Sequence, residues 1–71
     1  MMNVKRLKAR MIMMGKTVDG LCSALGISRT AWFRKTTGTS QFTQQEISLL
    51  RRELALDNDE TAMIFFDEEV A

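Results

Sequence analysis

The fold is decided between residues 17 and 38, where the chain reads TVDGLCSALGISRTAWFRKTTG. Apolar residues at 18, 21, 22 and 25 recur at three- and four-residue steps, which predicts one face of a helix that Thr17 can cap. Gly26 stands where this helix should end, in a position suited to left-handed backbone. Ser28 can then cap a short basic helix that ends near Gly38 and uses Trp32 as its core anchor. The stretch therefore predicts two helices joined by a tight turn.

The segment before this unit predicts another helix, near residues 4–14. Asn3 can cap it and Gly15 can end it. Its apolar side chains recur at helical steps and share one face, which we expect in the core: Val4, Leu7, Met11 and Met14. Most of its cations lie off that face, so a solvated surface is the more common explanation for them than a phosphate clamp.

The segment after the unit predicts two more helices. Thr43-Gln44-Gln45-Glu46 matches a capping box, in which the Thr and Glu side chains each satisfy a free backbone N–H. Phe42 and Ile47 flank that cap as a hydrophobic staple. An acidic stretch at 57–60 favours the start of a short fifth helix near 59–66, whose expected core side chains are Met63, Phe66 and either Ile64 or Phe65. We predict one all-α domain over residues 1–66 and a frayed acidic tail over 67–71.

Composition limits what this chain can do. It has 71 residues, no histidine, no proline and one cysteine. These counts argue against the usual zinc ligand sets, histidine general-base catalysis and any internal disulfide. No nucleophile stands with a base and no glycine-rich loop could cradle a phosphate, so we expect no enzyme, no cofactor, no metal and no small-molecule substrate. No membrane-spanning run or signal peptide is expected, and a reduced, cytoplasmic location fits best.

Charge is distributed unevenly along the chain. Residues 1–56 carry all ten Lys and Arg against three acidic residues, a net +7, whereas residues 57–71 carry a net −6. This asymmetry is typical of a basic body that meets a polyanion, but it is equally compatible with a solvated surface and a polar tail.

Residues 17–38 resemble the helix-turn-helix of the Cro/repressor type, often called XRE-like, found in phage and bacterial regulators. The resemblance rests on Leu21, Cys22, the turn Leu25-Gly26-Ile27-Ser28, Trp32, Arg34 and Gly38. The flanking helices extend it to about residues 4–66. It implies an all-α, five-helix, lambda-repressor-like DNA-binding domain.

The resemblance also implies which residues would meet double-stranded DNA. Base edges in the major groove would be read by the helix at 28–36 through Arg29, Thr30, Phe33 and Arg34. The DNA backbone would be met by Thr17, Ser28, Lys35, Thr37, Thr39 and Ser40. The implied function is a sequence-specific regulator of phage or prophage type, by default a repressor, acting as a homodimer in the bacterial host cytoplasm or nucleoid.

Some residues depart from the family's pattern and keep an alternative open. Val18 stands where the family often has a glutamine that braces the recognition helix, and Gly20 replaces a common Glu or Lys. Phe33 is apolar at a position that is usually polar, so it would contact either a thymine methyl or a protein. The alternative is a helix-turn-helix scaffold used as a protein-binding module, for example an antirepressor or assembly adaptor. Of Phe65 and Phe66, either one forms a dimer patch or both fold under the first helix.

Overall fold

The computed structural model describes residues 2–66 and contains five α-helices: α1 (Val4–Met13), α2 (Val18–Leu25), α3 (Arg29–Thr36), α4 (Gln44–Glu53) and α5 (Asn58–Phe65). No strand occurs between residues 2 and 66. The predicted all-α class is therefore confirmed. The tail predicted at 67–71 lies outside the described residues.

Each helix begins at a side chain that accepts a backbone N–H. Asn3, Thr17, Ser28 and Asp57 each accept from the residue three positions on, at 2.8–3.1 Å. The predicted capping box at α4 is present in both directions. These contacts satisfy donors that the first helical turn would otherwise leave unpaired, so the helix starts follow directly from the sequence.

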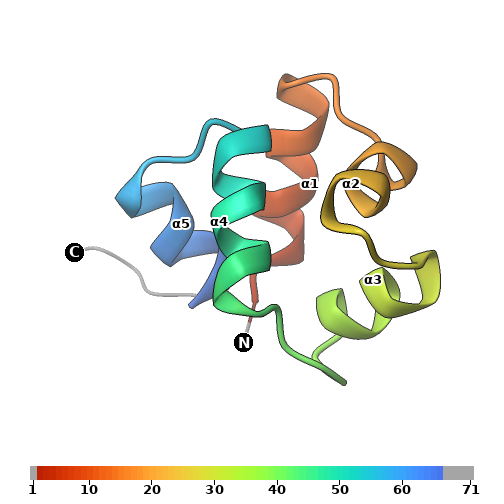
Figure 1. The fold of residues 1–71 in the computed structure, drawn as a ribbon. Coiled ribbons are helices and arrows are strands. Elements are labelled where there is room, and N and C mark those ends of the chain that lie inside the picture. The colour runs from red at the N-terminus through yellow and green to blue at the C-terminus, as the bar shows by residue number, and fades with distance from the viewer. Residues whose placement is uncertain (1, 67–71) are drawn as a thin grey trace.

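The helices surround one small core (Figure 1). In this view α4 lies in the centre, with α2 and α3 on one side and α5 on the other. α2 packs against both α3 and α4, and α1 packs against α5. The side chains at the centre are less than 2% exposed and come from both halves of the chain: Leu7, Leu21, Leu50, Leu54 and Ile64. Burial of these aliphatic groups is the main force that holds the five short helices together.

Two apolar residues that the sequence placed in the core lie at the surface instead. Met14 is 38% exposed and Phe66 is 58% exposed. Both stand one residue beyond the last helical residue, as the C-caps of α1 and α5. Because the helix has already ended, the three- and four-residue steps no longer set the direction of these side chains. The sequence left open whether Ile64 or Phe65 joins the core, and both do: Ile64 is fully buried and Phe65 packs against the core.

Candidate nucleic-acid interface

The candidate site is the outer face of α3. Its exposed side chains include the four that the sequence predicted for base reading: Arg29, Thr30, Phe33 and Arg34. Their spacing of one, three and one residues puts them on one side of the helix. Trp32 points the other way and is 6% exposed, which confirms it as the core anchor. The helix is thus held by one face while the opposite face is free.

The turn between α2 and α3 fixes where that face points. Gly26 has φ 70°, a left-handed conformation that an L side chain adopts only at a cost. The Ile27 N–H donates to the Cys22 carbonyl at 3.0 Å, which closes the turn. Further along, the Trp32 and Phe42 rings meet edge to face at 5.6 Å between centroids. The turn at its start and the aromatic contact near its middle therefore set the position of α3 on α2 and on the segment before α4.

Arg29 meets an acidic neighbour on α2. Its Nε lies 3.2 Å from Asp19 Oδ1, and both side chains are 73% exposed. An ion pair this exposed contributes about 0–1 kcal/mol. The pair therefore costs little to break, and the guanidinium can exchange Asp19 for another acceptor.

Among the residues predicted to meet the DNA backbone, Thr17, Ser28, Thr37, Thr39 and Ser40 are all exposed. The hydroxyl oxygens of Thr17 and Ser28 accept cap bonds, so their protons remain available to a second acceptor. Thr37 differs, because its hydroxyl donates to the Phe33 carbonyl at 2.9 Å. Thr39 and Ser40 donate their backbone N–H groups to the Arg34 carbonyl, which holds the loop against the end of α3.

Lys35 was also predicted to contact the DNA backbone, but its side chain is engaged within the protein. Its side chain is 14% exposed, and Nζ lies 2.9 Å from Glu46 Oε1 and 3.2 Å from the Gln41 carbonyl oxygen. Burial opposes ionisation of Glu46, but the N–H of Thr43 and the Lys35 ammonium outweigh it and lower the pKa of that carboxyl. The ammonium therefore ties α3 to α4 and is not free to meet a phosphate.

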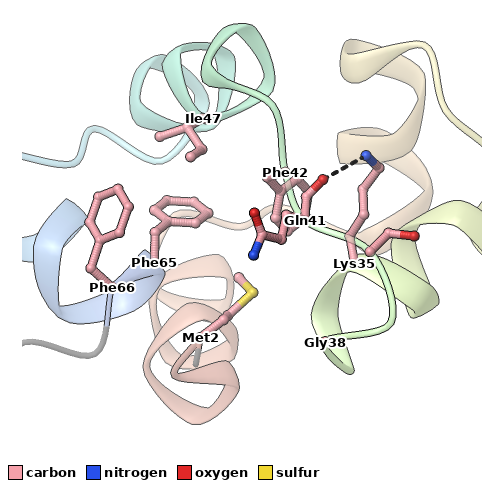
Figure 2. A pocket seen from close by; sticks show the side chains of 9 residues that line it. Met2, Lys35, Gly38, Gln41, Phe42, Ile47, Phe65 and Phe66 are labelled. Atoms are coloured by element: carbon pink, nitrogen blue, oxygen red, sulfur yellow. Dashed lines mark hydrogen bonds between the residues drawn. The ribbon is translucent and has the colours of Figure 1, made fainter.

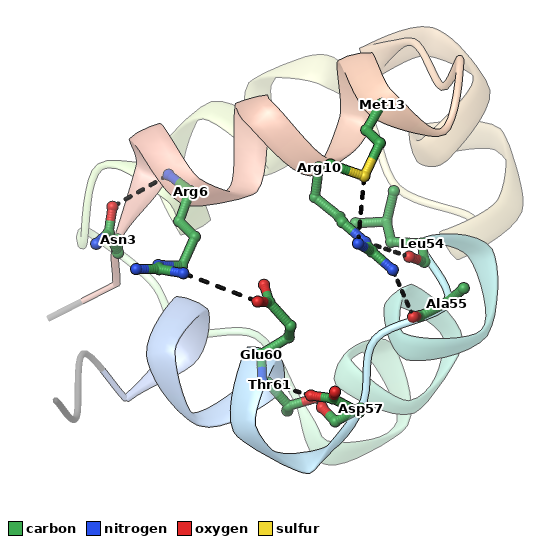
Figure 3. A network of polar contacts seen from close by, with 9 residues as sticks. All are labelled: Asn3, Arg6, Arg10, Met13, Leu54, Ala55, Asp57, Glu60 and Thr61. Carbon is green, nitrogen blue, oxygen red and sulfur yellow. Dashed lines mark hydrogen bonds and ion pairs between the residues drawn. The ribbon is translucent and has the colours of Figure 1, made fainter. Parts of the chain in front are cut away.

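Arg10 of α1 also serves the fold. Its Nε donates to the Leu54 carbonyl at 2.9 Å and its Nη2 donates to the Ala55 carbonyl at 2.8 Å (Figure 3). These are carbonyls at the C-terminal end of α4, where a cation is favoured. Arg10, one of the cations for which the sequence favoured a solvated surface over a phosphate clamp, therefore has a structural role instead.

Lys8 is a cation that sequence reasoning left outside the site. It lines a groove of about 550 Å³ beside α3, together with Val4, Val18 and Arg29 among others. Sequence spacing could show only that Lys8 lies off the core face of α1. Its approach to α3 depends on how the two helices pack, so no local pattern would have identified it.

Residues 2–66 contain no group of three or more His, Cys, Asp or Glu side chains that could hold a metal ion. Burial, with a smaller effect from Asp19, raises the pKa of the Cys22 thiol, which keeps it protonated and a poor nucleophile. No helix within these residues is long and apolar enough to cross a membrane.

The fold and this face together describe a small five-helix domain that presents one basic, partly apolar helix to its surroundings. No protein-family model matches the sequence, and no curated protein or solved structure matches it either. A function for this chain is therefore inferred from its own residues and from the resemblance of residues 17–38 to a helix-turn-helix.

Proposed function

We propose that this protein is a sequence-specific double-stranded DNA-binding regulator of phage or prophage type, with α3 as the recognition helix of a helix-turn-helix. The observation that supports it best is the division of α3 into two faces. Trp32 fixes one face in the core, while Arg29, Thr30 and Arg34 stand exposed on the other. A short helix held in this way can enter the major groove without unfolding any part of the core.

The chemistry of each exposed side chain fits a base edge. A guanidinium can donate two hydrogen bonds to guanine O6 and N7, so Arg29 and Arg34 are assigned to guanines. The Phe33 ring fits the methyl group of a thymine. The exposed hydroxyls at Thr17, Ser28, Thr39 and Ser40 suit phosphate oxygens, and Lys8 adds a cation in the groove beside α3.

A regulator of this size would act as a homodimer on a two-fold symmetric operator. One module of this kind makes a limited interface with DNA, and a second copy doubles it. Repression would follow by default, because a dimer bound over a promoter blocks access for polymerase.

The proposal is tested by selecting duplex fragments on the purified protein at physiological salt, with excess competitor DNA. The expected result is a short symmetric motif whose affinity falls steeply with added salt. Arg34→Ala should then weaken binding by about 1–3 kcal/mol and relax specificity at one base pair of each half-site. The matched control is Arg52→Ala, because Arg52 is an exposed cation on α4 and outside α3. If both variants lose the same DNA-binding affinity on every DNA sequence tested, Arg34 does not read a base.

A second function, a protein-binding module, is favoured by one observation. Phe33 is 67% exposed at the centre of the α3 face, and an exposed aromatic is typical of protein interfaces. Under this function the selection would recover no motif, and Phe33→Ala would abolish binding of a protein partner while Arg34→Ala would not.

A further inference from the structure

Exposed apolar side chains gather at the end of α1, outside the candidate DNA-binding face. Residues 2–66 expose five large apolar side chains, and three of them are consecutive: Ile12, Met13 and Met14. Ile12 is 81% exposed and Met13 is 70% exposed. Single exposed apolar residues are ordinary on a protein surface, whereas neighbouring ones mark contact surfaces. The end of α1 is therefore a candidate docking surface.

The helix places two of these side chains on one side together with two lysines. The residues on that side follow the three- and four-residue steps of a helix face, and all of them are exposed: Lys5, Lys8, Ala9, Ile12 and Met13. We call these five residues the outer face of α1. A helix normally uses this spacing to pack against other protein, yet here it faces away from the core.

The outer face of α1 is held in place before any partner arrives. Leu7 and Met11 fix the opposite side of the helix in the core. Arg10 ties the helix to the end of α4, and its Nη1 lies 3.4 Å from Met13 Sδ (Figure 3). A partner would therefore bind a helix that is already ordered, which avoids a large part of the entropy cost of association.

The charge of this part of the chain is positive. Residues 1–18 contain five Lys and Arg and no Asp or Glu. Within residues 2–66, no carboxylate forms an ion pair with Lys5 or Lys8. Two carboxylates from α4 and α5 do reach cations near α1, in the pairs Arg6–Glu60 at 3.8 Å and Lys16–Glu53 at 3.9 Å. A second copy of this face would add like charge, so the outer face of α1 favours an acidic partner.

An apolar pocket beside α5 differs in charge from the outer face of α1. It has a volume of about 370 Å³, and its lining includes Phe42, Phe65 and Phe66 (Figure 2). Phe66 is 58% exposed, and the three residues that follow it in the sequence, 67–69, are all acidic. An acidic partner would meet like charge next to Phe66. Charge therefore separates the two apolar surfaces, and Phe66 is a suitable control position.

We propose that the outer face of α1 binds an acidic, amphipathic helix of another protein, with Ile12 and Met13 against its apolar side chains and Lys5 and Lys8 beside its carboxylates. A helix fits because the face is itself a helical ridge about 12 Å long, or about two turns. The flexible Met13 side chain can adapt to the partner's shape. The lysines lie at the rim, where charge sets orientation more than affinity. The inference does not rest on the proposed function, since only Lys8 of these residues also lines the groove beside α3.

The test is a selection of random peptides, displayed on phage, against the full chain. Enriched peptides should combine Asp or Glu with apolar residues at three- and four-residue spacing. Because the contact is small, synthetic copies should bind with a dissociation constant of about 10–100 µM. Ile12→Gln should weaken this binding about 10-fold, since it removes the main apolar contact. The matched control is Phe66→Gln, which changes an exposed apolar residue on another helix end and should leave binding unchanged. Circular dichroism should show wild-type helix content in both variants.

The charge argument has its own measurement. Lys5→Gln should weaken binding of the acidic peptides about 2- to 5-fold, and added salt should weaken it as well. Arg52→Gln, which removes an exposed cation from α4, should not.

Three outcomes would overturn the proposal. The first is a selection that enriches no acidic peptide. The second is peptide binding that Ile12→Gln leaves intact. The third is binding of the chain to vesicles of equimolar phosphatidylglycerol and phosphatidylcholine that Ile12→Gln abolishes, because the face would then contact a membrane. None of these measurements uses DNA, so failure here and failure of the DNA-binding proposal are distinguishable.

Discussion

The Lys35–Glu46 pair gives the most discriminating test of how α3 is held. Glu46 Oε1 accepts from the Lys35 ammonium at 2.9 Å and from the Thr43 N–H at 2.9 Å. In Glu46→Gln the amide oxygen can still accept both bonds, but the acceptor no longer carries charge. A hydrogen bond with a charged group contributes about 1.5–3 kcal/mol, against about 0.5–1.5 kcal/mol for a neutral one. Because the side chains of both partners are only 14% exposed, solvent does little to reduce this difference.

We expect Glu46→Gln to lower the free energy of unfolding by about 1–2 kcal/mol at pH 7, which corresponds to a fall in Tm of roughly 4–16 °C. Urea unfolding followed by Trp32 fluorescence measures the loss. The matched control is Glu53→Gln. Glu53 pairs with Lys16 at 3.9 Å, and both side chains are more than 30% exposed, so this control should cost less than about 0.5 kcal/mol.

The pH dependence supplies the outcome that would refute the reasoning. The pKa of Glu46 is lowered in the folded protein from its ordinary value of 4.5, so its ionisation stabilises the fold at pH values above that. That contribution is lost as the pH falls through the lower, folded value. The difference between wild type and Glu46→Gln should therefore shrink toward zero in acid. A difference that persists there, or equal stabilities at pH 7, would show that the pair does not act as argued.

Three further predictions concern backbone geometry and the cap on α4, each measured by urea unfolding. Ala55 has φ 52°, so Ala55→Gly should raise the free energy of unfolding by about 0.5–1 kcal/mol; a loss would show that the position is unstrained. Gly26 has φ 70°, so Gly26→Ala should lower it by about 1–2 kcal/mol, and a neutral result would contradict the turn geometry. Arg10→Met should lower it by about 2 kcal/mol, because the Leu54 and Ala55 carbonyls lose a charged donor; an unchanged value would mean that water replaces the guanidinium without cost.

The sequence predicted the helix starts well because their signals are local. A capping side chain and the N–H it accepts from are three residues apart, so the residues that decide the cap stand side by side in the printed sequence. The same holds for the capping box of Thr43 and Glu46. The burial of Trp32 was also predicted correctly, because it is the large aromatic side chain on the core side of a short, otherwise polar helix.

The ends of the helices were less predictable. Met14 and Phe66 continue the apolar spacing of α1 and α5, yet each lies just beyond the helix and is exposed. Periodicity indicates which face is apolar but not at which residue the hydrogen-bonded ladder stops. Gly20, which departs from the family's pattern, lies close to the cap of its own helix. A Cβ at that position would lie 3.1 Å from the Thr17 hydroxyl oxygen that caps α2.

Long-range pairing could not be predicted from the sequence. Lys35 meets a residue 11 positions away, and Arg10 meets carbonyls 44 and 45 positions away. Neither pair leaves a local pattern, since the partners are brought together only when α4 packs into place. The sequence therefore carries no sign that Lys35 pairs with Glu46 or that Arg10 donates to carbonyls at the end of α4. The α3 residues predicted for base reading are exposed, because exposure of a helix face does follow from periodicity.

The buried thiol of Cys22 makes the α2–α3 unit open to kinetic study. The chain has one cysteine, it is buried on α2, and its sulfur lies 3.8 Å from the Ser28 carbonyl oxygen at the start of α3. An alkylating reagent can reach this sulfur when the packing around α2 opens, so its rate of modification measures how often that part of the core opens. A ligand bound to the outer face of α3 should therefore lower the rate at which Cys22 is alkylated.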